Sequence, residues 1–542
     1  MTLISIDAGA ISSASTIVEQ PGHASINDLL RQISRPLVLI ESDGQTKVVD
    51  VDKLITAGTV KSEHVRGTIP ACLLQSLGSR SFCRDHGLDY AYVGGSMAKG
   101  ISSVAMVKAF GEAGMLGFFG SAGLSLADVE AAIDVLQQHS PQIPFGVNLI
   151  HSPTEPELER SLVELYLRRG VHLIEASAFL GLTLPVVRYR THGIHRDAQG
   201  DIVAPNRVIA KVSREEIAAR FFAPPPEKFL RQLVASGDLS EEQARLAEQI
   251  PMAEDVTAEA DSGGHTDNRP ALSLFPTLLA QKHQMQQQYG YHQALRVGLG
   301  GGIATPTAAA AAFAMGADYL VTGTVNQACV ESGTCDAVRQ MLAETRQADI
   351  TMAPSGDMFE MGVKVQVVKR GTMFAIRAHK LYELYRSYES LEALPAAERE
   401  KIEQTFFKVP LQTVWEQTQS YFQVRDPRQV EKALNDPKYK MALVFRWYLG
   451  QTPVWANQGI ADRRIDYQIW CGPAMGAFNE WVKGSFMEPP AARKVVTVAY
   501  NILFGAAALQ RTRLLQQQWG DYRIDSDIDA PMPVDRIKEF LC

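Results

Sequence analysis

Glycines cluster after two apolar runs near residue 300 and predict a phosphate site. Gly300, Gly301 and Gly302 follow the run RVGL, and Gly323 and Thr324 follow the next run, YLVT. A backbone without Cβ atoms lets an anion come close to its N–H groups. One glycine cluster alone would favour a tight turn, but two clusters after consecutive apolar runs favour phosphate binding. We expect this phosphate to belong to a cofactor.

Two further stretches carry residues suited to ligand binding. The glycine-rich stretch VGGSMAKG contains Gly95, Ser96 and Met97, against which we expect the flat ring of the same cofactor to lie. Lys211 ends the apolar run VIAK, where burying its ammonium group requires a partner. That partner is either the cofactor or a carboxylate, Glu175 or Glu259, from a neighbouring run.

The elements that must position these residues are short apolar runs, each followed by a helical pattern. Strand–helix alternation of this kind predicts an α/β fold, a (β/α)8 TIM barrel, whose ligands bind at the carboxyl ends of the strands. Each run is apolar nearly throughout, as strands covered on both faces must be. The predicted strands are 91–95, 116–120, 144–148, 172–176, 208–212, 255–260, 296–301 and 319–323.

The domain boundaries follow from where this alternation begins and ends. Residues 1–85 form an N-terminal segment that contains a small β unit with a DG turn. Residues 86–350 form the barrel, with a helical insertion at about 214–250 that we expect on the active face. Residues 351–542 are mainly helical, and we expect them to provide a lid and a docking surface.

Composition excludes several classes of function. The chain has 53 basic and 60 acidic residues, a net charge of −7, which predicts no general attraction to nucleic acid or to a membrane surface. The sequence has no long uncharged apolar run and no secretory signal, so we expect a cytoplasmic protein. Its six cysteines lack CxxC spacing and predict reduced thiols rather than a metal site.

Several of these stretches together resemble a known family. VGGSMAKG, PFGVNLI, AEADSGGH, GLGGGIATPT and MFEMGVKVQVVKRGTMFAIRAHKLYELY are similar to the flavin-dependent, trans-acting enoyl reductases of polyketide and polyunsaturated fatty acid synthases. These enzymes in turn resemble nitronate monooxygenases, and the resemblance of this sequence to that wider superfamily covers roughly residues 85–350. AEADSGGH is similar to that superfamily's E-x-x-x-A-G-G-H loop, with Ser262 in place of the alanine. We expect the segment from Ser355 to Tyr388 to have no counterpart in nitronate monooxygenases.

The resemblance implies FMN as cofactor, reduced by NADPH in preference to NADH. Hydride then passes to the β-carbon of an α,β-unsaturated thioester carried by an acyl carrier protein of polyketide synthase modules. The FMN-binding residues implied are Gly95, Ser96 and Met97 at the ring, Asn148 and Lys211 at its polar edge, Gly264 in the histidine loop, and Gly301, Gly302, Gly323 and Thr324 at the phosphate.

His265 is the candidate catalytic residue. It follows two glycines after the sixth strand, so its ring can reach over the cofactor. In the superfamily this position serves as a base in nitronate oxidation, and in enoyl reduction it lies near the substrate. Here it would donate the α-proton or polarise the thioester carbonyl. The alternative is a histidine that only hydrogen-bonds the phosphate or the loop backbone.

A basic segment at residues 364–386 predicts the docking surface for the acidic carrier protein. We assign docking to Lys369, Arg370, Arg377 and Lys380. Alternatively, these side chains pair internally with Glu360, Glu383 and Glu389.

Two other functions stay open at this point. The first is a nitronate monooxygenase-like flavin oxidase, against which the long C-terminal helical region argues. The second is a non-catalytic assembly module of a synthase, against which the intact glycine loops and SGGH motif argue.

Overall fold

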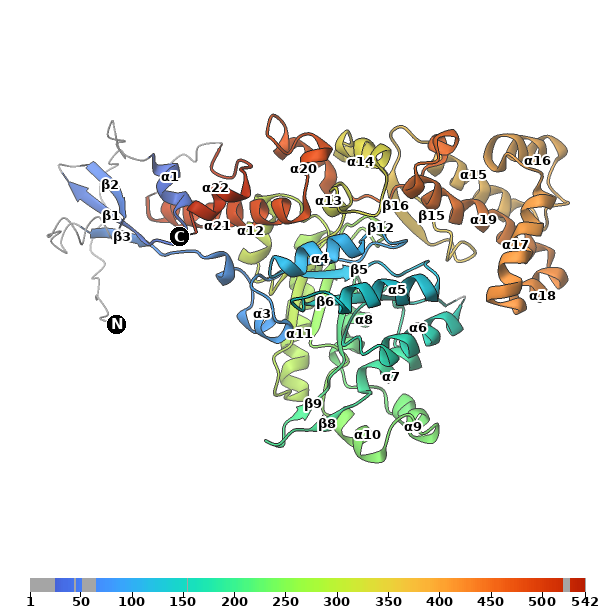
Figure 1. Cartoon of the computed structure of the whole chain (residues 1–542), viewed down its shortest axis with the longest axis horizontal. Coiled ribbons are helices and arrows are strands. Elements are labelled where there is room, and N and C mark those ends of the chain that lie inside the picture. The colour runs from blue at the N-terminus through green and yellow to red at the C-terminus, as the bar shows by residue number, and fades with distance from the viewer. Residues whose placement is uncertain (1–24, 43–44, 51–64, 154, 520–526, 542) are drawn as a thin grey trace.

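The computed structural model describes residues 25–42, 45–50, 65–153, 155–519 and 527–541. Figure 1 shows three parts in a row: a small N-terminal sheet at one end, a barrel in the middle, and a helical bundle at the other end. The expected DG turn, Asp43–Gly44, lies outside the described residues, as does Cys542. No helix within the described ranges is long and apolar enough to cross a membrane.

The predicted eight-stranded barrel is confirmed. Its strands close in the order β10-β11-β13-β14-β4-β5-β6-β7, and every neighbouring pair is parallel. Most strand residues are buried, which explains why each run is apolar on both faces. The strands are β4 Tyr92–Gly94, β5 Leu116–Phe119, β6 Phe145–Ile150, β7 Leu173–Ser177, β10 Arg207–Val212, β11 Asp255–Glu259, β13 Arg296–Gly300 and β14 Leu320–Thr322.

Helices cover the outside of this barrel. In α12 the Thr305 hydroxyl accepts the N–H of Ala308 as the N-cap, and Pro306 stands at the first position, both as expected. The covering helices are α4 Val104–Glu112, α5 Leu126–Gln137, α6 Pro156–Arg168, α7 Leu184–Thr191, α8 Glu215–Phe222, α11 Ala271–Tyr289, α12 Pro306–Ala314, α13 Thr324–Gln327 and α14 Asp336–Ala343.

The insertion near residues 214–250 does not lie on the active face, contrary to expectation. Its first helix, α8, packs on the barrel and returns the chain to the amino-terminal end, where the N–H of Met252 donates to the carbonyl of Ala223. The next two helices, α9 Glu227–Ala235 and α10 Glu241–Ala247, pack against α7 beside the hairpin of β8 His195–Arg196 and β9 Ile202–Val203 (Figure 1).

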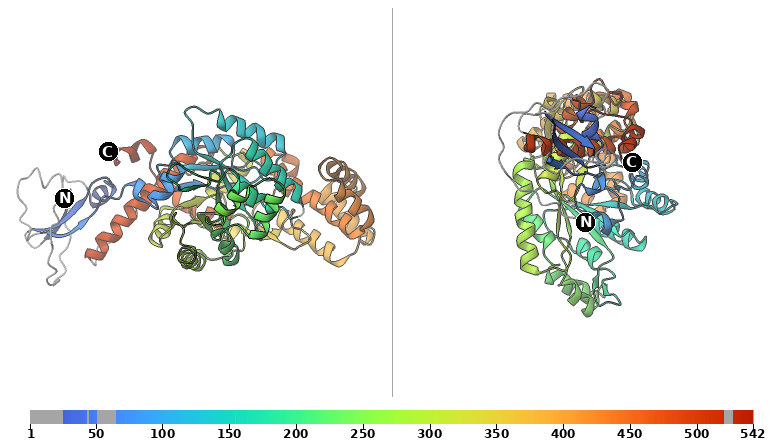
Figure 2. Two further views of the ribbon diagram at one scale, coloured as in Figure 1. Left: turned by 90° about the horizontal axis from the view of Figure 1, so that it is seen from below. Right: turned by 90° about the vertical axis from the view of Figure 1, so that its left-hand side faces the viewer.

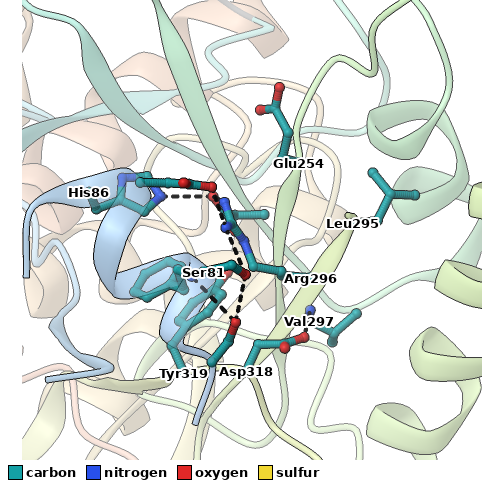
Figure 3. A network of polar contacts seen from close by, with 12 residues as sticks. Ser81, His86, Glu254, Leu295, Arg296, Val297, Asp318 and Tyr319 are labelled. Atoms are coloured by element: carbon teal, nitrogen blue, oxygen red, sulfur yellow. Dashed lines mark hydrogen bonds and ion pairs between the residues drawn. The ribbon is translucent and has the colours of Figure 1, made fainter. Parts of the chain in front are cut away.

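A buried ionic network closes the amino-terminal end of the barrel (Figure 3). Arg296 at the start of β13 donates to both carboxylate oxygens of Asp255, and His86 Nε2 lies 2.8 Å from Asp255. Asp85 accepts a further hydrogen bond from Arg296 at 2.7 Å. Burial alone would raise the pKa of Asp255, but Arg296 and His86 hold it well below its usual range. Because this end is opposite the expected site, we interpret the network as structural.

The N-terminal segment forms a three-stranded antiparallel sheet in the order β2-β1-β3. Its core shares one hydrophobic cluster with the long C-terminal helix α21, through residues such as Leu30, Leu37 and Leu515. Segments far apart in sequence therefore stabilise each other (Figure 2). The elements are α1 Ile26–Arg31, β1 Leu37–Ser42, β2 Gln45–Asp50, β3 Val65–Ile69, η2 Leu74–Ser76, α3 Arg80–His86, α21 Val495–Trp519 and α22 Val534–Glu539.

The region after residue 350 begins with strands and continues as helices. β15 Ile350–Pro354 and β16 Lys364–Val368 form a hairpin, and β16 pairs with β12 Gly264–His265 from the loop after β11. The following helices enclose a second hydrophobic core. They are α15 Phe374–Ser387, α16 Ala396–Ile402, the π-helix Glu403–Phe407, α17 Leu411–Arg425, α18 Pro427–Asn435 and α19 Pro437–Gln458, followed by η5 Ala461–Asp466, α20 Ala474–Val482 and η6 Pro490–Ala492.

Candidate active site at the carboxyl ends of the barrel strands

The loop after β4 is held by hydrogen bonds to neighbouring strands. The N–H of Gly95 donates to the carbonyl of Thr322 on β14 at 2.9 Å. Both the N–H and the hydroxyl of Ser96 donate to the carboxylate of Glu175 on β7. These bonds fix the backbone that we expect to face the ring.

Met97 lies in the same loop, which passes very close to the loop after β5. A Cβ atom on Gly120 would come within 1.8 Å of the Met97 carbonyl oxygen, so only glycine fits at this crossing. The N–H of Met97 donates to Ser102 at 2.9 Å, which holds the loop in this position.

Asn148 and Lys211 lie on either side of β7. The side-chain amide of buried Asn148 donates to the Glu175 carbonyl and to Ser177, each at 3.0 Å. The Nζ of Lys211 lies 3.7 Å from Glu175 and 3.5 Å from Glu259. Burial alone would lower the pKa of Lys211, but the two carboxylates raise it above its usual range. The carboxylate pairing is therefore present, and cofactor binding by Lys211 stays a prediction.

The glycine loops after β13 and β14 border open space. Gly301 and Gly302 both have φ +82°, a conformation that favours glycine. A Cβ on Gly301 would lie 2.7 Å from the Ala260 backbone, whereas a Cβ on Gly302 or Gly323 would meet no atom within 4 Å. The backbone of Gly302 and Gly323, at the ends of two neighbouring strands, therefore borders space that a larger side chain would occupy. These residues fit the phosphate of FMN.

The C-terminal region also reaches this end of the barrel. The N–H of Gly472 donates to the hydroxyl of Thr324 at 3.1 Å. A Cβ on Gly263 would lie 2.9 Å from the backbone of Cys471, so the histidine loop and this segment touch backbone to backbone. Sequence reasoning missed Cys471 and Gly472, because neither follows an apolar run of the barrel.

His265 is held by the hairpin that follows residue 350. Its Nε2 lies 3.0 Å from Asp357 Oδ1 and 3.1 Å from Ser355 Oγ, and its side chain is 30% exposed. Burial would lower the pKa of His265, but the Asp357 carboxylate raises it above the usual histidine value. His265 in turn holds the pKa of Asp357 well below its usual range, against the effect of burial. The pair therefore favours a protonated imidazole.

Two anchors fix the rest of the histidine loop. The Gln366 side chain on β16 donates to Asp261 and to the Ser262 carbonyl, at 2.8 and 2.7 Å. Arg214, after β10, makes a bidentate pair with Asp267 at 2.8 and 3.0 Å. The hydrogen bond from Arg214 lowers the pKa of Asp267 to about 2. The backbone that carries Gly264 and His265 is thus tied to two different parts of the chain.

The basic segment expected to dock a carrier protein is largely neutralised. The side chain of Arg377 is 15% exposed and pairs with the buried carboxylate of Asp466. Lys380 pairs with Glu398 at 3.2 Å. Arg377 thus joins two C-terminal elements, and its docking role stays a prediction that this pairing opposes.

The other two docking candidates lie nearer the surface. Lys369 is exposed. Arg370 is 49% exposed, lies 3.8 Å from Asp349 and donates to the carbonyl of Glu344. Internal pairing therefore occurs in this segment, but with partners other than the expected glutamates: Glu360 pairs with Arg446, for example.

Within the described ranges, no group of three or more histidine, cysteine or acidic side chains is placed to hold a metal ion. The charged groups at the strand ends instead pair with one another.

The family model for nitronate monooxygenase matches residues 86–378, more than half of the chain. The chain belongs to the nitronate monooxygenase family. A second model, the inserted helical domain of [acyl-carrier-protein] S-malonyltransferase, matches residues 388–467. The first match corrects one expectation, because most of the segment from Ser355 to Tyr388 does have a counterpart in the family. The matched part includes β16, which pairs with the short strand that carries His265.

Relatives come from synthase systems. One component of the polyunsaturated fatty acid synthase of Thraustochytrium is 48% identical over 468 residues, which are 85% of this chain and 31% of that component. The polyketide biosynthesis protein PksE of Bacillus subtilis is 41% identical over 487 residues, 90% of this chain and 63% of that protein. The chain therefore spans only part of these relatives.

A solved structure of an enoyl reductase domain is similar to this chain. The enoyl reductase domain of MlnA, from the macrolactin biosynthesis cluster of Bacillus amyloliquefaciens, is 38% identical and superposes with a TM-score of 0.77. The match covers 82% of this chain and all of that domain. The chain is thus enoyl reductase-like over most of its length.

Proposed function

We propose that this protein is an FMN-dependent enoyl reductase that takes its hydride from NADPH. Its substrate is an α,β-unsaturated acyl thioester on an acyl carrier protein, in polyketide or polyunsaturated fatty acid biosynthesis. The likeness to the MlnA enoyl reductase domain and to synthase proteins supports this proposal. FMN, when bound, supplies the hydride chemistry of the reaction.

The observation that carries the proposal is the pairing of His265 with Asp357. Reduction of an enoyl thioester leaves negative charge on the thioester oxygen and requires a proton at the α-carbon. A histidine whose pKa is raised keeps its proton to higher pH than usual, and the ring nitrogen that does not face Asp357 can meet that demand as an acid.

The remaining residues would orient the ligands and balance charge. The backbone at Gly302 and Gly323 would hold the FMN phosphate, with Gly301 turning the chain toward it and Thr324 beside it. Lys211, between two carboxylates, would hold positive charge near the electron-rich edge of the ring. Gly95, Ser96, Met97, Asn148 and Gly264 would complete the ring site.

A nitronate oxidase is the second candidate, because the matching family model carries that name. An oxidase of this kind that starts from the neutral nitroalkane first removes its α-proton and needs the same histidine in its neutral form. Asp357 stabilises the charged form instead and so opposes this role. The pair therefore favours reduction over oxidation.

Anaerobic half-reactions test the proposal. The purified flavoprotein should be bleached by NADPH and should regain its yellow colour on addition of a crotonyl thioester, with butyryl thioester as the product. Bleaching of the flavin by a nitronate and its reoxidation by oxygen, with no reaction toward enoyl thioesters, would instead support the oxidase.

A further inference from the structure

A cleft separates the barrel from the helical subdomain, which we define as residues 388–467. Its volume is about 590 Å³, within the range of small-molecule sites. The loop after β6 and the turn between β15 and β16 form one side, and α18 and α19 of the subdomain form the other, together with the end of α15, which directly precedes the subdomain. Its apolar and aromatic lining comprises Pro153, Pro156, Met358, Met361, Tyr385 and Tyr439. The rest of the lining is polar or charged and includes three carboxylates, each with a partner of its own: Glu360 pairs with Arg446, Asp426 pairs with Arg428, and Asp436 accepts the N–H of Tyr439.

The cleft lies beside the candidate active site. Met358, which lines it, directly follows Asp357, the partner of His265. The two sides are joined where Arg425, at the end of α17, pairs with Glu155 in the loop after β6 at 2.7 Å. This ion pair ties the subdomain to the barrel, so the cleft does not lie between independent parts.

One cation on the cleft lacks an acidic partner in the described part of the chain. The Nζ of Lys432 lies 3.9 Å above the ring of Tyr439, and none of the ion pairs there includes it. Arg428, by contrast, pairs with Asp426 at 2.8 Å. The ammonium of Lys432 is exposed and therefore available to an anionic ligand.

We propose that this cleft binds the phosphopantetheine arm of the carrier protein, with the phosphate at Lys432 and the thioester end toward His265. The proposal rests on the proposed function and names the route by which its substrate enters. Methionine, tyrosine and proline suit an arm that alternates amides with methyl-bearing carbon, whereas a hydrocarbon chain would favour a lining without charges.

The family match of the subdomain supports this occupant independently. The helical domain that matches residues 388–467 is the inserted domain of [acyl-carrier-protein] S-malonyltransferase, an enzyme named for its carrier protein. Such a transferase and a reductase of carrier-bound thioesters would both bind the carrier protein and its phosphopantetheine arm. The same subdomain here lies over a barrel that performs different chemistry.

Two variants test the cleft. Met361→Trp should narrow it, and because Met361 is 56% exposed the larger side chain should not disturb the core. Lys432→Glu should repel the phosphate. The matched control is Lys483→Glu, an exposed lysine paired with Glu480 outside the cleft.

Each variant is assayed with an enoyl thioester on carrier protein, on pantetheine without phosphate, and on N-acetylcysteamine. We expect Met361→Trp to reduce kcat/KM for carrier-bound substrate about tenfold more than for the N-acetylcysteamine thioester. Lys432→Glu should reduce kcat/KM for carrier-bound substrate much more than for the pantetheine thioester. Fluorescence anisotropy of labelled, arm-bearing carrier should show weaker binding to both variants and unchanged binding to the control.

Other outcomes overturn the proposal. Equal losses with all three thioesters would mean that the cleft supports the fold, and unchanged binding of the carrier would place its arm elsewhere. Losses that follow acyl length rather than the arm would assign the cleft to the acyl chain. A wild-type protein that reduces no enoyl thioester would refute the proposed function, while the anisotropy measurement would still test the cleft.

Discussion

Replacing Asp357 by asparagine should lower the pKa of His265 and weaken its function as an acid. The perturbation keeps the size of the side chain and removes its charge 3.0 Å from Nε2. Because the pKa of His265 is raised in the folded protein, its stabilising contribution is present below the ordinary histidine pKa. That contribution is lost as pH rises through the raised value.

The magnitude follows from the geometry. Two unit charges at this distance interact by ~1.4 kcal/mol in a water-like medium and by ~5.5 kcal/mol in a typical protein surface environment. The His265 and Asp357 side chains are 30% and 45% exposed, so screening by solvent favours the lower figure. That figure corresponds to a fall of about one pKa unit.

Two measurements check this prediction. NMR titration of the His265 ring should show the lower pKa in Asp357→Asn, and the pH profile of flavin reoxidation by an enoyl thioester should shift to lower pH by the same amount. Ser355→Ala, which removes a neutral partner, should shift it less. Asp336→Asn, which removes an exposed carboxylate paired with Arg339, should not shift it. An unchanged titration in Asp357→Asn would refute the reasoning.

Three further predictions concern stability, acid sensitivity and cofactor retention, and a fourth concerns docking. Asp255→Asn should lower the free energy of unfolding by about 1–3 kcal/mol in denaturant titrations, because two donors of the buried Arg296 lose their carboxylate while Asp85 still pairs with the guanidinium; an unchanged free energy of unfolding would contradict this. Because the pKa of Asp267 is lowered from 3.8 to about 2, its carboxylate should stabilise the folded protein above pH 3.8, and this stabilisation should be lost as pH falls through 2. The difference in Tm between wild type and Asp267→Asn, measured against pH, checks this. Gly302→Val should yield folded protein without FMN, and full flavin occupancy would refute the phosphate site. Charge reversal of Lys369 and Arg370 should reduce kcat/KM for carrier-bound substrate but not for a short thioester, because these side chains would dock the carrier. Equal losses with both substrates would mean that the two residues have a structural role.

The barrel could be predicted from sequence because its signals are local. Each strand is a short apolar run whose end carries glycine or a polar residue, and parallel packing places all those ends together. The glycines at 301, 302 and 323 and His265 were predicted for this reason. At Gly301 and Gly302 the backbone has φ +82°, a conformation that glycine adopts readily and that a glycine-rich run therefore indicates.

The partners of these residues could not be predicted, because they come from distant segments. Asp357 reaches His265 only through the pairing of β16 with β12, and Gly472 reaches Thr324 across 148 positions. The same limitation applies to Arg377, whose neutralising partner, Asp466, lies 89 positions away and could not be inferred from the sequence.

The most direct test of the proposed function is an isotope-labelling experiment under anaerobic conditions. The protein, loaded with FMN, is given NADPH deuterated at the transferable position and a crotonyl thioester on its carrier protein. We expect butyryl product with deuterium at the β-carbon and, when the experiment is repeated in D2O with unlabelled NADPH, deuterium at the α-carbon. Recovery of unchanged crotonyl thioester, together with oxygen-dependent turnover of a nitronate by the same preparation, would contradict the proposed function.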